Sequence, residues 1–286
     1  KSIPPAILFH SPTIAQFANI LRGEKWPGPW SSLVPGQTNG SKLPFFWIHG
    51  DNSIALLPRY LGPDQPLYGL EHQSQDGKPA RYTRIETIAA HYLEEIRVVQ
   101  PRGPYFLGGY SVGGIVAFEA AQQLTKQGEE VAFLFLLDSH FPGIDIPIPR
   151  NESFRTKVRR HFRNIALLGY EEKLTYVLAR AKERIKFSFN QTAIETRELL
   201  KKAVCRVYLE MGHPLPPHLR GFYIFHLIYR QAWCNYTPKP YSGRAIYIKA
   251  ENRRSDFAFH WDRLMAGRLE AHEVPGCNYL EIMEEP

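Results

Sequence analysis

The chain has 286 residues, 44% of them hydrophobic, and a formal net charge of +7 at pH 7. This length and composition are ordinary for a soluble globular protein with a sizeable core, and no apolar run approaches the roughly 18 residues that span a bilayer. The three cysteines are scattered without metal-ligand spacing, which argues against a disulfide framework. Phosphate-loop, zinc-finger and basic-zipper motifs are also absent from the sequence. We expect a cytoplasmic protein with no nucleic-acid partner and no membrane association.

The N-terminal residues predict one short helix followed by a linker. Ser11 is a suitable N-cap and Pro12 a suitable first helical residue. Apolar residues then recur on one face until Gly23. Residues 24–42 carry repeated Pro, Gly, Asn and Ser, a composition typical of linkers. We therefore expect the main domain to begin at about residue 43.

Short apolar strands alternate with amphipathic helices over the first half of this domain. The strands are expected at residues 45–48, 66–70, 105–107 and 131–137, and the helices at 85–99 and 115–126. Such an alternation predicts a mostly parallel central sheet with helices on both faces.

Residues 141–235 interrupt this alternation and are expected to be mainly helical. The candidate helices are 154–168, 173–187, 195–211 and 219–235. The sheet pattern resumes with a strand at 245–248, a helix at 256–266 and a strand at 269–274. A long helical insertion between late strands is typical of a lid over an active site, and a plain helical subdomain is the alternative.

The sharpest motif is Gly-x-Ser-x-Gly, formed by Gly109, Ser111 and Gly113. It follows an apolar strand and precedes an amphipathic helix, which is the setting of a nucleophile elbow. Small flanking residues let strand and helix approach closely, and the turn lifts the Ser111 hydroxyl clear of the sheet. The same turn aims the Val112 N–H toward an oxyanion. We predict that Ser111 is the nucleophile; an ordinary glycine-rich turn is the alternative.

A second oxyanion donor is expected from the loop after an earlier strand. The strand at 45–48 leads into His49-Gly50-Asp51-Asn52. The backbone N–H of Asp51 is the candidate donor. We interpret His49 as a structural loop histidine rather than a base.

Several segments together resemble the thioesterase domains that terminate nonribosomal peptide and polyketide synthases. The matching segments are Phe46-Trp47-Ile48-His49-Gly50, Tyr68-Gly69-Leu70-Glu71, Gly108-Gly109-Tyr110-Ser111-Val112-Gly113-Gly114, Leu136-Leu137-Asp138-Ser139, Tyr236-Thr237-Pro238-Lys239-Pro240-Tyr241-Ser242-Gly243 and His272-Glu273-Val274-Pro275-Gly276. The resemblance runs from about residue 43 to the C-terminus and implies an α/β-hydrolase fold.

Residues 8–18 resemble the last helix of an acyl or peptidyl carrier domain. The resemblance then implies a carrier helix at 1–23, a linker at 24–42, and a thioesterase domain at 43–286 with its lid at about 141–235. The partners implied are the upstream carrier domain and a small acyl or peptidyl substrate. That substrate arrives as a thioester on the carrier's phosphopantetheine arm, and no cofactor is bound covalently in this chain.

In such domains the acid of the catalytic triad follows the strand after the elbow helix, and Asp138 has that position. A carboxylate there accepts an imidazole N–H and stabilises the imidazolium that forms during attack. Glu251 and Asp256 follow the next strand, as in many other α/β hydrolases. The resemblance favours Asp138 over these two acids.

The sequence departs from the family at the triad histidine, which belongs in the loop after the last strand. Residues 275–286 contain no histidine, and the place expected for it holds Tyr279 or, counted from Gly276, Asn278. Imidazole has a pKa of about 6.5 and takes a serine proton at neutral pH, whereas tyrosine near 10 stays protonated and an amide is no base. The family also continues with a further helix, which leaves open a C-terminal truncation.

Three interpretations of this departure stay open. The domain is a silenced thioesterase, or it carries a substitution at Tyr279, or another histidine serves as the base. His272, on the strand before the loop, and His260, among aromatic neighbours, are the other histidines considered. Both have a structural interpretation as well.

Two features of the insertion have alternative interpretations. Basic residues cluster between 155 and 186, either to attract a phosphopantetheine phosphate or an acidic carrier surface, or as the solvated face of helices. Aromatic residues between 222 and 233 either line an acyl tunnel or belong to the core.

Three functions follow from these alternatives. The first is release of an acyl or peptidyl chain through an acyl-Ser111 intermediate, by hydrolysis or cyclisation. The second is a catalytically impaired thioesterase-like domain that binds the carrier or its acyl chain. The third is a free-standing lipase or esterase, which the carrier-like N-terminal helix disfavours.

Overall fold

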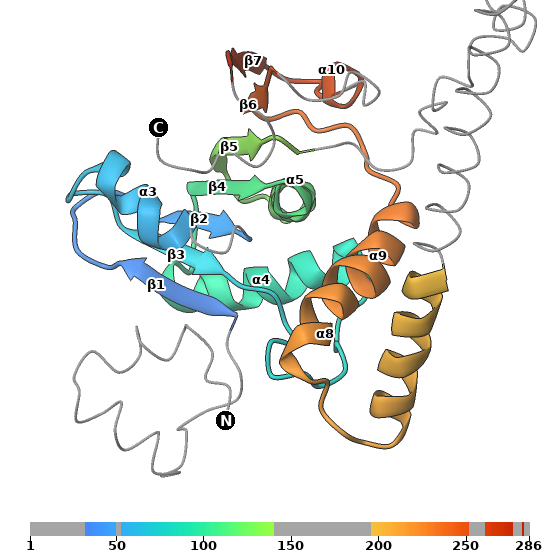
Figure 1. The fold of residues 1–286 in the computed structure, drawn as a ribbon. Coiled ribbons are helices and arrows are strands. Elements are labelled where there is room, and N and C mark those ends of the chain that lie inside the picture. The colour runs from blue at the N-terminus through green and yellow to red at the C-terminus, as the bar shows by residue number, and fades with distance from the viewer. Residues whose placement is uncertain (1–31, 50–52, 140–195, 252–260, 277–281, 283–286) are drawn as a thin grey trace, which may run out of the picture. The chain divides into compact units, whose positions relative to one another are not determined.

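The computed structural model describes residues 32–49, 53–139, 196–251, 261–276 and 282 (Figure 1). The chain divides into two compact units, one comprising residues 1–144 with 214–286 and the other residues 145–213. The sheet belongs to the first unit. Within the described ranges, every helix is too short or too polar to cross a membrane.

The described residues form a seven-stranded sheet with the order β1-β3-β2-β4-β5-β6-β7, which Figure 1 shows from bottom to top. The strands are β1 (Leu33–Gln37), β2 (Phe45–Ile48), β3 (Leu67–Leu70), β4 (Tyr105–Tyr110), β5 (Val131–Leu137), β6 (Ala245–Ala250) and β7 (Leu269–Val274). Each neighbouring pair is parallel except β1 and β3, which are antiparallel. The prediction of a mostly parallel sheet is confirmed.

Helices cover both faces of this sheet. The connections carry α3 (Ser53–Leu61), α4 (Ile85–Val99), α5 (Val112–Lys126) and α10 (Trp261–Leu264). The chain steps in one direction from β2 to β3 and in the other direction in the later connections. Because parallel crossovers are right-handed, α3 covers one face while α4 and α5 cover the other. On the latter face, the ring of Trp261 packs 5.0 Å from that of Phe118 in α5.

β1 lies within residues 24–42, where the sequence predicted only linker. Proline and glycine at positions 35 and 36 obscured the strand, but an edge strand tolerates proline because its other side has no partner. Glu95 of α4 accepts hydrogen bonds from the N–H groups of Ser32 and Leu33, 3.0 and 2.6 Å long. The sheet therefore begins ten residues earlier than the expected domain boundary at 43.

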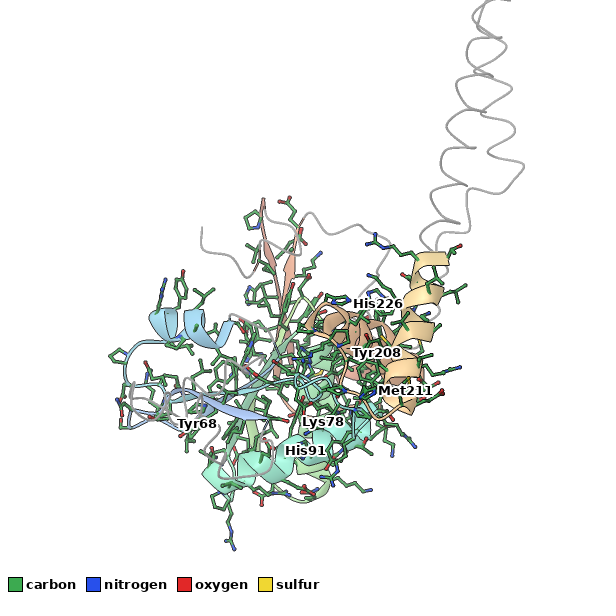
Figure 2. The ribbon with its side chains drawn as sticks, turned by 60° about the horizontal axis from the view of Figure 1, so that its bottom comes forward. Tyr68, Lys78, His91, Tyr208, Met211 and His226 are labelled. Atoms are coloured by element: carbon green, nitrogen blue, oxygen red, sulfur yellow. The ribbon has the colours of Figure 1, made fainter. Side chains whose placement is uncertain are left out.

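Residues 214–235, the last part of the segment expected as a lid at 141–235, belong to the unit that holds the sheet. There α8 (Pro217–Phe222), the π-helix η1 (Tyr223–Tyr229) and α9 (Arg230–Cys234) follow one another. In the second unit the expected helix at 195–211 is found at 196–210. It and the turn after it carry exposed apolar side chains, among them Tyr208 and Met211 (Figure 2).

Other predictions lie outside the described residues. These are the N-terminal helix, the helices at 154–168 and 173–187, and the first part of the helix at 256–266. The sequence also gave no indication of α3, which has Pro58 in its interior. The strands predicted at 45–48, 131–137 and 269–274 and the helix predicted at 85–99 were found with these bounds, and the ends of the remaining elements differ by one to three residues.

The first turn of α5 packs directly on the end of β2. A Cβ on Gly113 would collide with the carbonyl oxygen of Ile48 and lie 2.9 Å from the Cβ of His49. Because one of these obstacles is backbone, no side-chain rearrangement relieves the clash. Glycine at 113 is therefore required for α5 to sit where it does.

Two glycine substitutions test this packing. Gly113→Ala should lower the free energy of unfolding by about 1–3 kcal/mol, because the helix must move away from β2. Gly221→Ala is the matched helical control: a Cβ there meets nothing within 4 Å, so the smaller backbone entropy of alanine should raise the free energy by about 0.5–1 kcal/mol. Denaturant unfolding measures both, and equal changes would contradict the packing described.

Candidate active site

Three adjacent parallel strands end in residues with left-handed backbone. His49 follows β2 with φ 57°, Ser111 follows β4 with φ 53°, and Asp138 follows β5 with φ 45°. Non-glycine residues adopt this region at a cost of about 1–3 kcal/mol each, and such strain gathers at functional sites. The β2–β4 junction is also where the strand order reverses, the position at which open α/β sheets bind ligands.

Ser111 lies in a tight connection between β4 and α5. Its backbone has φ 53° and ψ −120°, and its N–H donates to the carbonyl oxygen of Leu137 over 2.9 Å. A Cβ on Gly109 would collide with the backbone of Gly113, so the strand and the helix approach as an elbow requires. The expected strand–turn–helix arrangement is present, and the nucleophilic role of Ser111 stays a prediction.

Of the two predicted oxyanion donors, the structure describes Val112 but not Asp51. Val112 is the first residue of α5, so its N–H belongs to the helix N-terminus, where backbone donors have no partner within the helix and favour negative charge. Asp51 lies outside the described residues.

Asp138 lies beside Ser111, and both residues follow the carboxyl ends of neighbouring strands. Tyr110 and Leu137 are paired in register, so Ser111 and Asp138 each follow one member of a facing pair. Asp138 is completely buried; its N–H donates to the Ile248 carbonyl over 2.7 Å. Its Oδ1 lies 3.5 Å from the N–H of Ala250, the last residue of β6. The carboxylate therefore reaches along the strand ends toward β6.

Glu251, one of the rival acids, is exposed and has a different partner. Its N–H donates to the Val274 carbonyl over 3.0 Å, and its Oε2 accepts the Gly276 N–H over 2.7 Å. Glu251 thus fixes the start of the loop after β7. The other rival, Asp256, lies outside the described residues, as do Asn278 and Tyr279 in that loop.

Of the two histidines that could substitute for the missing base, the structure describes His272, and it does not lie beside Ser111. His272 is on β7, three strand spacings from β4, which is about 14 Å. Its Nε2 contacts Glu270 Oε1 at 2.9 Å on the exposed edge of the sheet. His260 lies outside the described residues.

His49 belongs to a buried cluster of four rings, with His72, Tyr92 and Tyr229. Its Nε2 lies 2.8 Å from the Tyr92 hydroxyl and 3.0 Å from the Tyr229 hydroxyl. His72 Nδ1 lies 2.8 Å from the Tyr229 hydroxyl, and the two imidazole rings are 3.8 Å apart. The structural interpretation of His49 agrees with these contacts.

Burial keeps both imidazoles neutral at ordinary pH. It lowers the pKa of His49 well below its usual range, and the neighbouring His72 lowers it further. Burial likewise lowers the pKa of His72 to about 3. The same desolvation raises the pKa of Tyr92 above the ordinary tyrosine range; a hydrogen bond with Tyr229 lowers it in part, and Glu95 and Glu71 raise it. Desolvation also raises the pKa of Tyr229, and the neighbouring Tyr92 raises it further. None of the four rings takes up or releases a proton near pH 7.

The sequence does not reveal this cluster. Tyr92 lies within the helix predicted at 85–99, and Tyr229 is one of the aromatic residues between 222 and 233. His72 could not be predicted as a member, because one histidine after a short strand carries no periodic signal. The contacts join residues far apart in the chain, and only the sheet order brings them together.

A groove of about 830 Å³ lies along the C-terminal half of α5 and the segment after α9. Within it Tyr236 donates to Glu119 Oε2 over 2.6 Å, and Gln122 donates to the Tyr236 hydroxyl over 3.2 Å. Ser111 precedes the other end of α5 and does not line this groove. Among the described residues, no group of three or more His, Cys, Asp or Glu side chains is arranged to hold a metal ion.

A mostly parallel sheet with a strained serine between a central strand and a helix defines the α/β-hydrolase fold. One similar solved structure is the four-domain nonribosomal peptide synthetase holo-AB3403, bound to AMP and glycine. The match covers 99% of this chain and 21% of that chain, with a TM-score of 0.62 and 23% sequence identity. Another is the NocB thioesterase domain in covalent complex with a fluorophosphonate nocardicin G analog, where the match covers 89% of this chain and 93% of that chain, with a TM-score of 0.55 and 22% sequence identity. These likenesses show the fold.

Residues 56–199, half of the chain, match the model of the thioesterase domain family, and the chain belongs to this family. Malpibaldin synthetase of Mortierella alpina is 38% identical over 138 residues, which are 46% of this chain and 2% of that protein. A non-reducing polyketide synthase of Cladonia metacorallifera is 46% identical over 151 residues, 52% of this chain and 7% of that protein. The chain spans a small fraction of the length of these relatives.

The buried histidines make stability depend on pH. Because their folded-state pKa values lie below the unfolded value of about 6.5, the unfolded chain binds more protons, and the free energy of unfolding should fall from about pH 6.5 toward pH 3. Each ring contributes up to about 1.4 kcal/mol per pH unit. His72→Phe should make this slope smaller in urea titrations at pH 4–6, and an unchanged slope would contradict the assignment.

Proposed function

We propose that the domain releases an acyl or peptidyl chain from a thioester through an acyl-Ser111 intermediate. The substrate is carried on the phosphopantetheine arm of an upstream carrier domain, whose last helix would be residues 1–23. The observation that supports this proposal most is the strained Ser111 at the head of α5, with Asp138 buried at the neighbouring strand end. The name of one relative, a non-reducing polyketide synthase, agrees with a carrier-bound substrate.

In the first half of the reaction the Ser111 hydroxyl attacks the thioester carbonyl. The carbon–sulfur bond breaks, the pantetheine thiol leaves with a proton, and the acyl group stays on Ser111. The N–H groups of Val112 and Asp51 would stabilise the oxyanion that forms. In the second half, water releases a free acid, or a hydroxyl or amine of the chain itself closes a macrocycle.

Both halves require a base, and the loop after β7 is where we expect it. Asp138 reaches toward β6. Glu251, the residue after β6, fixes the start of that loop by accepting the N–H of Gly276. An imidazole at position 279 would have Asp138 as its orienting acid. The tyrosine found there cannot take this part at neutral pH, and loss of the histidine from a serine triad costs about a million-fold in turnover.

The second candidate function is a thioesterase-like domain that binds the carrier or its acyl chain without turnover. The contacts of the described histidines favour it: His49 is neutral and held by two tyrosines, and His272 is bound to Glu270 three strands from Ser111. In this case the turn at Ser111 would have a structural role only.

A probe and a substitution separate the two functions. Tyr279→His should restore turnover of a short acyl-pantetheine thioester by several orders of magnitude, because it supplies the missing base. The parent and the Ser111→Ala/Tyr279→His double variant should stay near background, and a fluorophosphonate should label only forms with Ser111. Each form is then incubated with a carrier-bound acyl thioester, and mass spectrometry of the intact protein detects transfer of the acyl group to Ser111.

The outcomes are distinct. Activity in the parent that Ser111→Ala abolishes means that an unrecognised base exists. Inactivity of Tyr279→His, with normal folding and normal binding of the acyl-carrier, contradicts the enzymatic proposal and leaves the binding function.

The acid is tested in the Tyr279→His background. Asp138→Asn should lower kcat by about 10⁴, since an amide neither orients nor stabilises the imidazolium. Glu251→Gln is the matched control and should change kcat by less than about tenfold, because its partner is a backbone N–H. Steady-state kinetics decide, and a reversed order of effects would make Glu251 the acid.

A further inference from the structure

The buried cluster of His49, His72, Tyr92 and Tyr229 supplies no reacting group to the proposed acyl transfer. Its members come from four places in the chain: the ends of β2 and β3, the middle of α4, and the last residue of η1. All four side chains are at least 95% buried. Such a cluster is costly to bury unless its polar atoms are paired, which makes it a structural device with a specific geometry.

The hydrogen bonds determine the tautomer of His49. The Tyr92 hydroxyl donates its proton to the Glu71 carbonyl over 3.0 Å. Its oxygen therefore accepts from His49 Nε2, which must carry the proton of the neutral ring. The Tyr229 oxygen lies 3.0 Å from the same Nε2 and accepts there too. Two tyrosine oxygens thus hold one N–H of His49 from two different helices.

His49 in turn touches the elbow. Its Cβ lies close to the first turn of α5 at Gly113, two residues after Ser111. Its own backbone is in the left-handed region, with φ 57°. A ring fixed by tyrosines therefore fixes a strained residue against the helix that carries the Val112 N–H. Movement of this ring would be transmitted to the elbow through rigid backbone.

We propose that Tyr229 is a positioning residue for the Ser111 elbow, acting through His49 and His72. The proposal rests on the proposed function for its kinetic consequence, but its structural part does not. Tyr229 ends the segment of wide π-helical turns at 223–229, a rare element that is often found at functional sites. It joins this segment to the ends of β2 and β3.

The same π-helix offers a matched control. Tyr223, its first residue, is 7% exposed, and its hydroxyl accepts the N–H of Ala80 over 3.0 Å. Ala80 precedes α4 and has no contact with the cluster of four rings among those described. Tyr223→Phe and Tyr229→Phe each remove one buried hydroxyl from one helical segment. They differ in whether the lost hydrogen bond leads to His49.

The structural part is tested without any turnover, by NMR on the parent and the two variants. In the parent, the Nε2 proton of His49 should exchange slowly, and its ¹⁵N shifts should report the Nε2–H tautomer. Tyr229→Phe should speed exchange of this proton and of the Gly113 and Gly114 amides by about tenfold or more, because one of two holding oxygens is gone. Tyr223→Phe should leave these rates within about twofold.

The kinetic part uses the same substitutions in the Tyr279→His background. Tyr229→Phe should lower kcat by about tenfold or more with a smaller change in KM, because a displaced elbow misplaces the nucleophile and oxyanion donor. Tyr223→Phe should lower neither. If Tyr229→Phe fails to fold, His72→Phe replaces it: this change keeps a ring against Tyr229 but removes Nδ1, and it should also speed His49 exchange.

The two parts fail separately. Unchanged exchange at His49 and Gly113 in Tyr229→Phe, or equal changes in Tyr223→Phe, overturns the positioning role. Faster exchange in Tyr229→Phe alone, in a protein whose Tyr279→His form has no turnover, supports the positioning role and contradicts only the proposed function.

Discussion

The approach of α5 to the end of β2 is the constraint on which the rest of the candidate site depends. Gly113 faces the Ile48 carbonyl with no room for a methyl group. The helix can come this near only if β4 turns within one residue, which places Ser111 in left-handed backbone. His49, the residue that follows β2, likewise has left-handed backbone and turns away there. Backbone contact at one point therefore produces strain at two of the three strand ends.

The four-ring cluster helps to hold the strained strand end at His49 in place. Two imidazoles and two phenols lose their hydration there, and the hydrogen bonds among them offset part of that cost. Neutrality is a consequence, since burial lowers the pKa of both histidines. The histidine nearest the elbow in the sheet is thus committed to structure. The base that the proposed function requires is therefore expected on the opposite side, toward β6, where Asp138 Oδ1 lies 3.5 Å from the N–H of Ala250.

The sequence was informative wherever the signal was local. The elbow could be predicted because Gly109, Ser111 and Gly113 sit between a strand and a helix of clear periodicity. β1 could not, because its proline and glycine indicate a turn unless the strand is known to lie at an edge. The division between the two units at residue 213 could not be predicted either, since helices of the two units have the same periodicity. The role of His49 depends on rings from three other elements, and no local pattern reveals such contacts.

The elbow meets two separate requirements, one at position 113 and one at position 111. Gly113 is needed by packing against Ile48 whatever the chemistry, so its presence argues for the fold. Position 111 is different, because its backbone, with φ 53° and ψ −120°, would be less strained with glycine than with serine. A domain that only needed the turn would be more stable with glycine there. A serine that bears this strain at a helix N-terminus, next to a buried carboxylate, therefore supports the proposed acyl transfer over a purely structural role. Under that proposal the loop after β7 has to supply the proton acceptor that a tyrosine at position 279 cannot be at neutral pH.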